Sequence, residues 1–403
     1  MIFFMTALIP LLLAVTWVCP LDKKVPPLPT SNYRVLWVKD SAELRRALES
    51  GPQDVTIMVA DGIYSLPEPI SMQKGKNIVL RGASGNPAKA IIQGKGFSAG
   101  NPGDDLLRIG KVDNFTIAYL TLADCRSYGI KIEAESFPRN IHIYGCHFRD
   151  IGIRMIKGST SLEGKAVGGS IRYCRFENTK IPPADWLFGG DYITAIDMMA
   201  LEGWTISDNL FRDIKGRNGG ARGAIFIWVR SKNVSVERNA ILNCDRGISF
   251  GNPSGSTNYL PGQEHIRDST IKNNIILPGP DAAIELWWAE NIQIYNNTIW
   301  RKDSTGPGLR GGMNEWKIKR IDVANNLVRG ANRLEGEVTL RNNLFGNLTG
   351  LEVDFHSENF QLLGFVAAAK GRGLPLQAVI DDFAGQARST TPDIGAFETG
   401  GAR

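Results

Sequence analysis

The segments STIKNNIIL (269–277), IQIYNNTIW (292–300) and IDVANNLV (321–328) decide the fold of this 403-residue chain. Each alternates apolar and polar residues, as a β-strand with one buried face does, and then reaches an Asn pair. The same pattern recurs in FTIAYLTL (115–122), IHIYGCHF (141–148), SIRYCRF (170–176), WTISDNLF (204–211), VSVERNAIL (234–242) and EVTLRNNLF (337–345). Repetition at this spacing indicates a coil repeat with loops inserted between strands.

Alignment of these segments places one residue of each in a common column. The column comprises Leu120, Cys146, Cys174, Asn209, Asn239, Asn274, Asn297, Asn326 and Asn343. A stacked Asn amide can hydrogen-bond to its neighbours and to turn backbone, and a small thiol can take its place. We therefore expect Cys146 and Cys174 to continue the column as thiols; a disulfide between them is the alternative.

A second strand opens each coil. These strands are LLRIG (106–110), GIKIE (129–133), IRMI (153–156), AIDMM (195–199), AIFIWV (224–229), GISFG (247–251) and AIELWW (283–288). Parallel strands joined into closed coils give a solenoid in which each coil pairs with the next. Over residues 55–347 the chain resembles a right-handed parallel β-helix of the pectate-lyase-like superfamily. The predicted fold is therefore all-β.

The two ends of the chain suggest its organisation. Residues 1–19 carry no charge, so we expect a cleaved signal peptide or a membrane anchor. We predict a β-helix over 35–347, opened by an amphipathic helix at 40–50 that covers the first coil, and an irregular or capping segment over 348–403. Segments 59–96 and 390–398 resemble the opening and closing parts of bacterial members of the superfamily. That resemblance implies a secreted, periplasmic or cell-surface protein.

Composition narrows the function classes. Hydrophobic residues make up 43% and charged residues 22%, as in folded proteins, and the net charge of +5 has no basic run. Nucleic acid is therefore an unfavourable choice of partner. The cysteines lack CxxC spacing and the histidines are few, so no zinc site is expected. We expect a monomer whose membrane contact is limited to the N-terminal segment.

We predict that the outward side chains of the opening strands form the functional face of the solenoid. One column is read as Arg108, Lys131, Arg154, Asp197, Phe226, Ser249 and Glu285, and the next as Glu133, Met199, Trp228, Gly251 and Trp287. Exposed Trp228 and Trp287 would stack on sugar rings, and the cations would suit an acidic polysaccharide. In the alternative interpretation, Arg154 and Asp197 form an exposed ion pair and the aromatic residues pack under loops.

Long loops beside this face, at 157–170, 179–192, 215–223 and 251–265, supply further candidates. The proposed catalytic residues are Asp191, Asp197, Lys215, Arg217, Arg222 and Arg246, and the proposed substrate-binding residues are Arg154, Trp186, Trp228, Arg230, Glu285 and Trp287. A uronate lyase needs a cation on the substrate carboxylate and a base beside it. A glycosidase needs two carboxyls about 5 to 9.5 Å apart. Asp197 and Glu285, three coils apart, are too far separated for that role.

Segment 224–252 is similar in layout to the catalytic coils of alginate lyases and chondroitinase B-like lyases. Arg230-Ser231 stands where those enzymes have Lys-Ser, and Gly251-Asn252 stands where they have Arg-His. Gly223 and Ile225 fall where their calcium-binding glutamates lie. The base and the Ca²⁺ ligands therefore do not carry over. No cofactor or metal residue is assigned, and Ca²⁺ stays an open alternative without ligands. The sequence predicts an exported lyase or hydrolase of an acidic glycan; a non-catalytic carbohydrate-binding or structural surface protein is the alternative.

Overall fold

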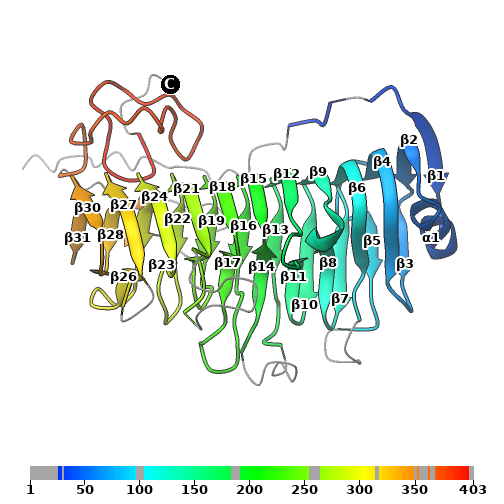
Figure 1. Cartoon of the computed structure of the whole chain (residues 1–403), viewed down its shortest axis with the longest axis horizontal. Helices are drawn as coiled ribbons and strands as arrows, with labels where there is room; N and C mark the ends of the chain where they lie inside the picture. Colours follow the sequence, from blue (N-terminus) through cyan, green and yellow to red (C-terminus); the bar gives the residue numbers. More distant parts are fainter. Residues whose placement is uncertain are drawn as a thin grey trace, which may run out of the picture.

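The computed structural model describes residues 26–29, 31–96, 104–182, 191–253, 264–313, 317–348, 352–353, 362–363 and 368–398. Its coils follow one another along a single long axis (Figure 1). Within these residues the regular structure is almost entirely parallel β-strand. The chain is therefore an all-β solenoid, as predicted. Residues 1–19, with the expected signal or anchor, lie outside the described part.

Each coil contributes strands to three faces. The first face holds β8 (Tyr128–Glu133), β11 (Arg154–Ser159), β14 (Thr194–Met199), β17 (Gly223–Trp228), β20 (Ile248–Phe250), β23 (Ile284–Leu286), β26 (Pro307–Gly311) and β29 (Ala331–Leu334). The second face holds β1 (Arg34–Val38), β2 (Gln53–Val59), β9 (Arg139–Tyr144), β12 (Ala166–Arg172), β15 (Leu201–Ser207), β18 (Ser231–Glu237), β21 (Ile266–Lys272), β24 (Ala289–Tyr295), β27 (Ile318–Ala324) and β30 (Val338–Arg341). β4 (Ile70–Gly82) and β6 (Leu107–Ala118) run through both faces and join them into one sheet.

The third face forms a separate parallel sheet. It comprises β3 (Gly62–Ser65), β5 (Ala90–Gln93), β7 (Thr121–Cys125), β10 (His147–Ile151), β13 (Arg175–Glu177), β16 (Leu210–Arg212), β19 (Ala240–Leu242), β22 (Ile275–Leu277), β25 (Thr298–Trp300), β28 (Leu327–Arg329) and β31 (Leu344–Gly346). A short antiparallel pair, β32 (Glu352–Val353) and β33 (Leu362–Leu363), follows. The inward side chains of all three faces form one continuous apolar core from Val38 to Val328. Because each coil buries its apolar side against its neighbours, the stack is stabilised between adjacent coils.

The predicted asparagine column is confirmed. Each Asn amide donates to the side-chain oxygen of the Asn one coil further on, at 2.9 or 3.0 Å, from Asn209 to Asn343. The same amides also donate to backbone carbonyls, for example Asn274 Nδ2 to Val236 O at 2.9 Å. The column therefore satisfies the polar backbone at the bend between the second and third faces.

The cysteines continue this column as thiols. Cys146 and Cys174 are free and buried, and the backbone N–H of Cys174 donates to Asn209 Oδ1 at 2.9 Å. Cys125 and Cys244 are likewise free and buried. The thiol interpretation is confirmed over the disulfide, and Cys19 lies outside the described residues.

The helix expected at 40–50 is present as α1 (Ser41–Glu49), at one end of the stack (Figure 1). Asp40 accepts a hydrogen bond from the Glu43 N–H and so caps the first turn. Leu44 and Leu48 are buried and belong to the core. A three-residue 3₁₀ turn, Ala134–Ser136, follows β8. No helix of the described residues is long and apolar enough to cross a bilayer.

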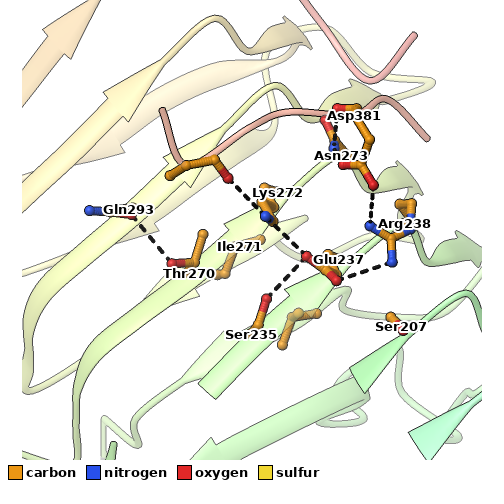
Figure 2. Close-up of polar contacts among 12 residues, drawn as sticks. Ser207, Ser235, Glu237, Arg238, Thr270, Ile271, Lys272, Asn273, Gln293 and Asp381 are labelled. Carbon is orange, nitrogen blue, oxygen red and sulfur yellow. Dashed lines mark hydrogen bonds and ion pairs between the residues drawn. The ribbon is translucent and has the colours of Figure 1, made fainter. Parts of the chain in front are cut away.

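The C-terminal segment, residues 368–398, returns along the outside of the coils near the opposite end from α1 (Figure 1). Figure 2 shows one attachment, where Asp381 meets Arg238 at 2.8 Å and its carbonyl accepts from Asn273 Nδ2 at 2.8 Å. Beside them Lys272 pairs with Glu237 at 3.2 Å. The segment also covers apolar side chains of the third face, since Phe383 and Phe397 pack with Leu242 and Leu277 and with others there.

Candidate functional site

The outward column of the first face differs from the predicted one at a single coil. Lys157 pairs in register with Lys131 and with Asp197, whereas Arg154 pairs with Tyr128 and Thr194. Lys157, which sequence reasoning missed, therefore occupies the outward position assigned to Arg154. The rest of the column is in the predicted register, because Asp197, Phe226, Ser249 and Glu285 lie on successive coils.

Asp197 is the centre of a buried ionic group. Its Oδ2 lies 3.0 Å from Arg154 Nε and 3.1 Å from Lys157 Nζ, and its Oδ1 accepts from Trp228 Nε1 at 3.0 Å. The predicted ion pair between Arg154 and Asp197 is present, but it is buried and not exposed, since their side chains are 1% and 0% exposed. Burial alone would raise the pKa of Asp197, but Lys157 and Arg154 outweigh burial and lower it. Asp197 is therefore an ionised buried carboxylate.

Trp228 and Trp287 do not form the exposed stacking platform that the sequence suggested. They are 8% and 3% exposed. Trp228 stacks on Phe226 at 5.2 Å between ring centroids and packs against Tyr192 and Met199. The alternative interpretation, in which the aromatic residues pack under inserted loops, is supported for Trp228 by Tyr192 and His265, at the ends of two of those loops. For Trp287 only the burial is observed. Alternation places a side chain on the outer face but says nothing about what covers that face.

Tyr192 lies between two guanidinium groups. The Arg154 guanidinium is 4.2 Å from the Tyr192 ring centroid and that of Arg222 is 5.5 Å away. Arg222 also lies 5.2 Å from the Phe226 ring. These cation–π contacts link the Asp197 group to a second ionic group, which surrounds Glu285.

The second group surrounds Glu285, which is 0% exposed. Glu285 accepts from Ser249 Oγ at 2.7 Å and from Arg310 Nη2 at 2.7 Å, and Arg246 Nη1 lies 2.9 Å from its Oε1. Arg222 Nη1 is 3.8 Å from the same oxygen. The predicted proximity of Arg222 and Arg246 is thus confirmed.

Asp281 completes this second group. It pairs with Arg246 and, at 2.8 Å, with Arg310. Burial would raise the pKa of Asp281, but the two arginines outweigh it and lower the pKa. Sequence reasoning missed Arg310 and Asp281. The alternating run PGLRG (307–311) has the pattern of the other opening strands and could have placed Arg310 in the column.

We call these ten residues the charged strip. They are Arg154, Lys157, Tyr192, Asp197, Arg222, Arg246, Ser249, Asp281, Glu285 and Arg310.

The 215–222 loop borders the charged strip and is fastened by two carboxylates. Asp245 accepts from the N–H groups of Gly216 at 2.8 Å and Ala221 at 3.1 Å, and Asp191 accepts from the Asn218 N–H. Burial raises the pKa of Asp245. Asp191 therefore has a structural contact in addition to its proposed role.

Two other predicted catalytic residues lie on this loop. Lys215 pairs with Asp213 at 3.3 Å, and Arg217 is exposed. Neither forms an ion pair with the charged strip within the described residues.

Arg230 lies outside the charged strip. Its guanidinium donates to Gly164 O at 3.0 Å and to Thr160 Oγ1 at 3.1 Å, so it fastens the 160–164 loop. It also lines a surface cavity of about 330 Å³ together with residues including Glu202 and Lys232. The predicted site residue Trp186 lies outside the described residues.

His265 and Asn252 form a pair that sequence reasoning did not assign to the site. The Asn252 N–H donates to His265 Nδ1 at 3.1 Å, and the imidazole is buried 5.8 Å from the Trp228 ring. Asn252 Oδ1 in turn accepts from Arg222 Nη2 at 3.1 Å. The isolated position of His265 in the sequence gave no sign of this contact.

Among the described residues, no group of three or more His, Cys, Asp or Glu side chains is placed to hold an ion. The carboxylates of the charged strip are each bound by arginine or lysine, which occupies the oxygens that Ca²⁺ would need.

Comparison with known proteins places the chain in a fold class. No protein-family model and no curated protein matches the sequence. Among solved structures, pectate lyase Pel9A matches with a TM-score of 0.54 at 11% identity, over 91% of this chain and 97% of that one. A rhamnogalacturonan lyase matches with a TM-score of 0.52 at 11% identity, over 76% and 87%.

The tailspike protein of E. coli bacteriophage HK620, in complex with a pentasaccharide, matches with a TM-score of 0.51 at 12% identity, over 78% of this chain and 58% of that one. These similarities confirm the parallel β-helix fold that the repeats predicted. At such low identity they establish the fold alone.

Proposed function

We propose that this chain is an exported carbohydrate-active protein that binds an acidic, uronate-containing glycan along the charged strip. The observation that carries the proposal is the strip itself, because the outward face of a coil needs no buried charge to be stable. Lys157, Arg222 and Arg310 keep 12%, 16% and 23% of their side chains exposed, so a ligand can reach cations in both groups. The fold's occurrence in pectate lyase, rhamnogalacturonan lyase and a pentasaccharide-binding tailspike supports a glycan as ligand.

In the enzymatic form of this proposal, the protein is a lyase or a hydrolase. Arg222 and Arg246 would neutralise the substrate carboxylate, and Lys215, on the bordering loop, would serve in its neutral form as the proton acceptor, with Arg217 as a further cation for the substrate. Asp191 remains the proposed carboxyl partner for hydrolysis. Asp197 and Glu285 would position the cations rather than react, since both are fully buried.

A non-catalytic binding or structural role is the second candidate, and the burial of Asp197 and Glu285 favours it. Neither carboxylate can approach a glycosidic bond without movement of the residues around it. Such a protein would hold a glycan at the same strip without cleaving it.

A panel of acidic polysaccharides separates these functions. New absorbance from unsaturated uronides indicates a lyase, new reducing ends without that absorbance indicate a hydrolase, and retention without products indicates a binding protein. Neutral polysaccharides serve as the control. If no acidic glycan is bound or cleaved, the proposal is wrong.

We further propose that α1 caps the first coil, that the chain is a monomer, and that any membrane contact is limited to residues 1–19. The burial of Leu44 and Leu48 against the core supports the capping role.

A further inference from the structure

The Glu285 group carries more positive than negative charge. Three guanidinium groups, Arg222, Arg246 and Arg310, surround two carboxylates, Asp281 and Glu285, which leaves a net charge of +1. Among the described residues, no further carboxylate lies within ion-pair distance of these arginines. Burying an uncompensated charge is costly, so the group is incomplete without another anion.

Two donors of this group make no hydrogen bond, although one of them keeps an ion pair with Glu285. Arg246 is 8% exposed, and its Nη1 lies close to Glu285 Oε1 but makes no hydrogen bond in the geometry observed. Arg310 Nε is buried and likewise has no hydrogen-bond partner. Leaving buried donors unsatisfied costs free energy, which an incoming oxyanion would recover.

The cations lower in the same column do not share this surplus, whereas the Asp197 group does, since Arg154 and Lys157 both pair with its one carboxylate. Arg108 pairs with Asp105 at 2.7 Å, and Lys131 pairs with Glu133 at 3.6 Å, one cation to one carboxylate. The excess is therefore a property of the charged strip and not of the whole face.

We propose that Arg222, Arg246 and Arg310 form a subsite for a singly charged oxyanion carried on a sugar, either a sulfate ester or a carboxylate. Asp281 and Glu285 act as positioning residues that hold the three guanidinium groups around the position of the missing anion. The inference rests on the proposed function and deepens it, because it locates the recognition of the acid group in three arginines from separate coils. One added anion brings the group to neutrality.

The test compares thermal unfolding of the full chain in chloride with unfolding in added anion. The probes are inorganic sulfate, glucose 6-sulfate and glucuronate at equal ionic strength, with glucose as the neutral control. We expect each bound anion to raise the melting temperature of the wild type, because a ligand that binds only the folded state stabilises it. A larger shift with glucose 6-sulfate than with glucuronate identifies a sulfate ester as the ligand, and the reverse identifies a carboxylate.

Arg310→Gln is the test variant, and Arg333→Gln is its matched control. Arg333 is the register neighbour of Arg310 on the next coil and is exposed. We expect Arg310→Gln to weaken the apparent affinity for the probe by about tenfold or more, and Arg333→Gln to leave it unchanged. If Arg310→Gln fails to fold in chloride, Arg310→Lys, which keeps the charge but loses the guanidinium donors, should show a reduced shift.

Equal shifts in the wild type, Arg310→Gln and Arg333→Gln would overturn the inference, because sulfate stabilises many proteins by exclusion from their surface. An equal shift with glucose would also overturn it. The glycan panel tests the proposed function separately. If the protein binds the anions but no glycan, the subsite is supported and the proposed function is wrong. If it binds a glycan and Arg310→Gln does not weaken that binding, the proposed function is supported and the subsite is wrong.

Discussion

At Asn274 a single amide serves several polar partners at once. Its Nδ2 donates to Val236 O, Lys272 O and Asn297 Oδ1 at 2.9 to 3.0 Å, and the side chain is 0% exposed. Its Oδ1 accepts from Asn239 of the preceding coil. One residue therefore satisfies polar groups on three successive coils.

We expect Asn274→Ala to lower the free energy of unfolding by about 2 to 4 kcal/mol, because the substitution leaves several buried polar groups without partners. Chemical denaturation measures this loss. Asn291→Gly is the control, since Asn291 is exposed, has a φ of 52°, and makes a side-chain contact at the surface. An equal loss in both variants would mean that the column contributes nothing beyond a turn residue.

The lowered pKa of Glu177 should make the stability of the protein depend on pH. Burial raises its pKa, but hydrogen bonds from His147 and Arg175 outweigh burial and lower the pKa from 4.5 to about 2. Because the folded-state pKa lies below the unfolded one, the contribution of Glu177 to stability is present above pH 4.5 and is lost as the pH falls towards 2.

We therefore expect Glu177→Gln to be less stable than the wild type by about 1 to 3 kcal/mol at pH 7, and this difference to shrink between pH 4.5 and 2. Urea unfolding at several pH values measures it. Glu335→Gln, at an exposed position on the last coils, is the control. A difference that stays constant with pH would contradict the prediction.

Single residues also show where prediction from sequence stopped. The column of Asn and Cys could be predicted because its members recur in one pattern with little insertion between strand and bend. Lys157 could not be placed, because the run IRMIKGS offers two outward registers and only pairing with Asp197 selects one. Burial of Trp228 stayed one of two open interpretations for a different reason, since residues distant in the sequence, such as Tyr192 and His265, contact it.

Among the elements, the C-terminal segment 368–398 is held differently from the coils. It contacts them through side chains such as Arg238, Asn273 and Lys272, and it adds no strand to the three faces. The coils were readable from alternation, and α1 from its cap and apolar face. The path of this segment could not be predicted, because its sequence shows no repeated pattern.

We expect Arg238→Ala to speed proteolytic cleavage within 368–398 while the coils stay resistant. Arg238 pairs with Asp208 at 2.9 Å and Asp381 at 2.8 Å, so its loss removes an attachment of the segment. Limited proteolysis followed by mass spectrometry locates the cuts. Arg267→Ala, which removes an ion pair whose arginine is 52% exposed, is the control. Cleavage of the coils at the same rate as the segment would show that Arg238 stabilises the whole stack instead.

On the scale of the whole molecule, a stack of coils has two ends that must be kept from pairing with other chains. α1 lies at one of them, with Leu44 and Leu48 turned into the core.

We expect the double substitution Leu44→Asn and Leu48→Asn to loosen α1 and to promote self-association, because the first coil would then expose apolar residues and strand edges. Light scattering coupled to size-exclusion chromatography measures the mass. Substituting the exposed Arg46 by Asn is the control on the same helix. A double variant that remains monomeric and as stable as the wild type would refute the proposed capping role.

The repeated amide contact has a consequence for how such a chain can change length. From Asn209 to Asn343 each Asn donates to the Asn of the next coil and accepts from that of the preceding coil, so a whole turn could be duplicated or deleted and the amide contacts would still match. The group around Glu285 would be broken by such a duplication or deletion, because its members come from four consecutive turns: Arg222, Arg246, Glu285 and Arg310. A turn added within the Asn column therefore keeps the amide contacts at its junctions, whereas a turn added between Arg222 and Arg310 would separate those four residues.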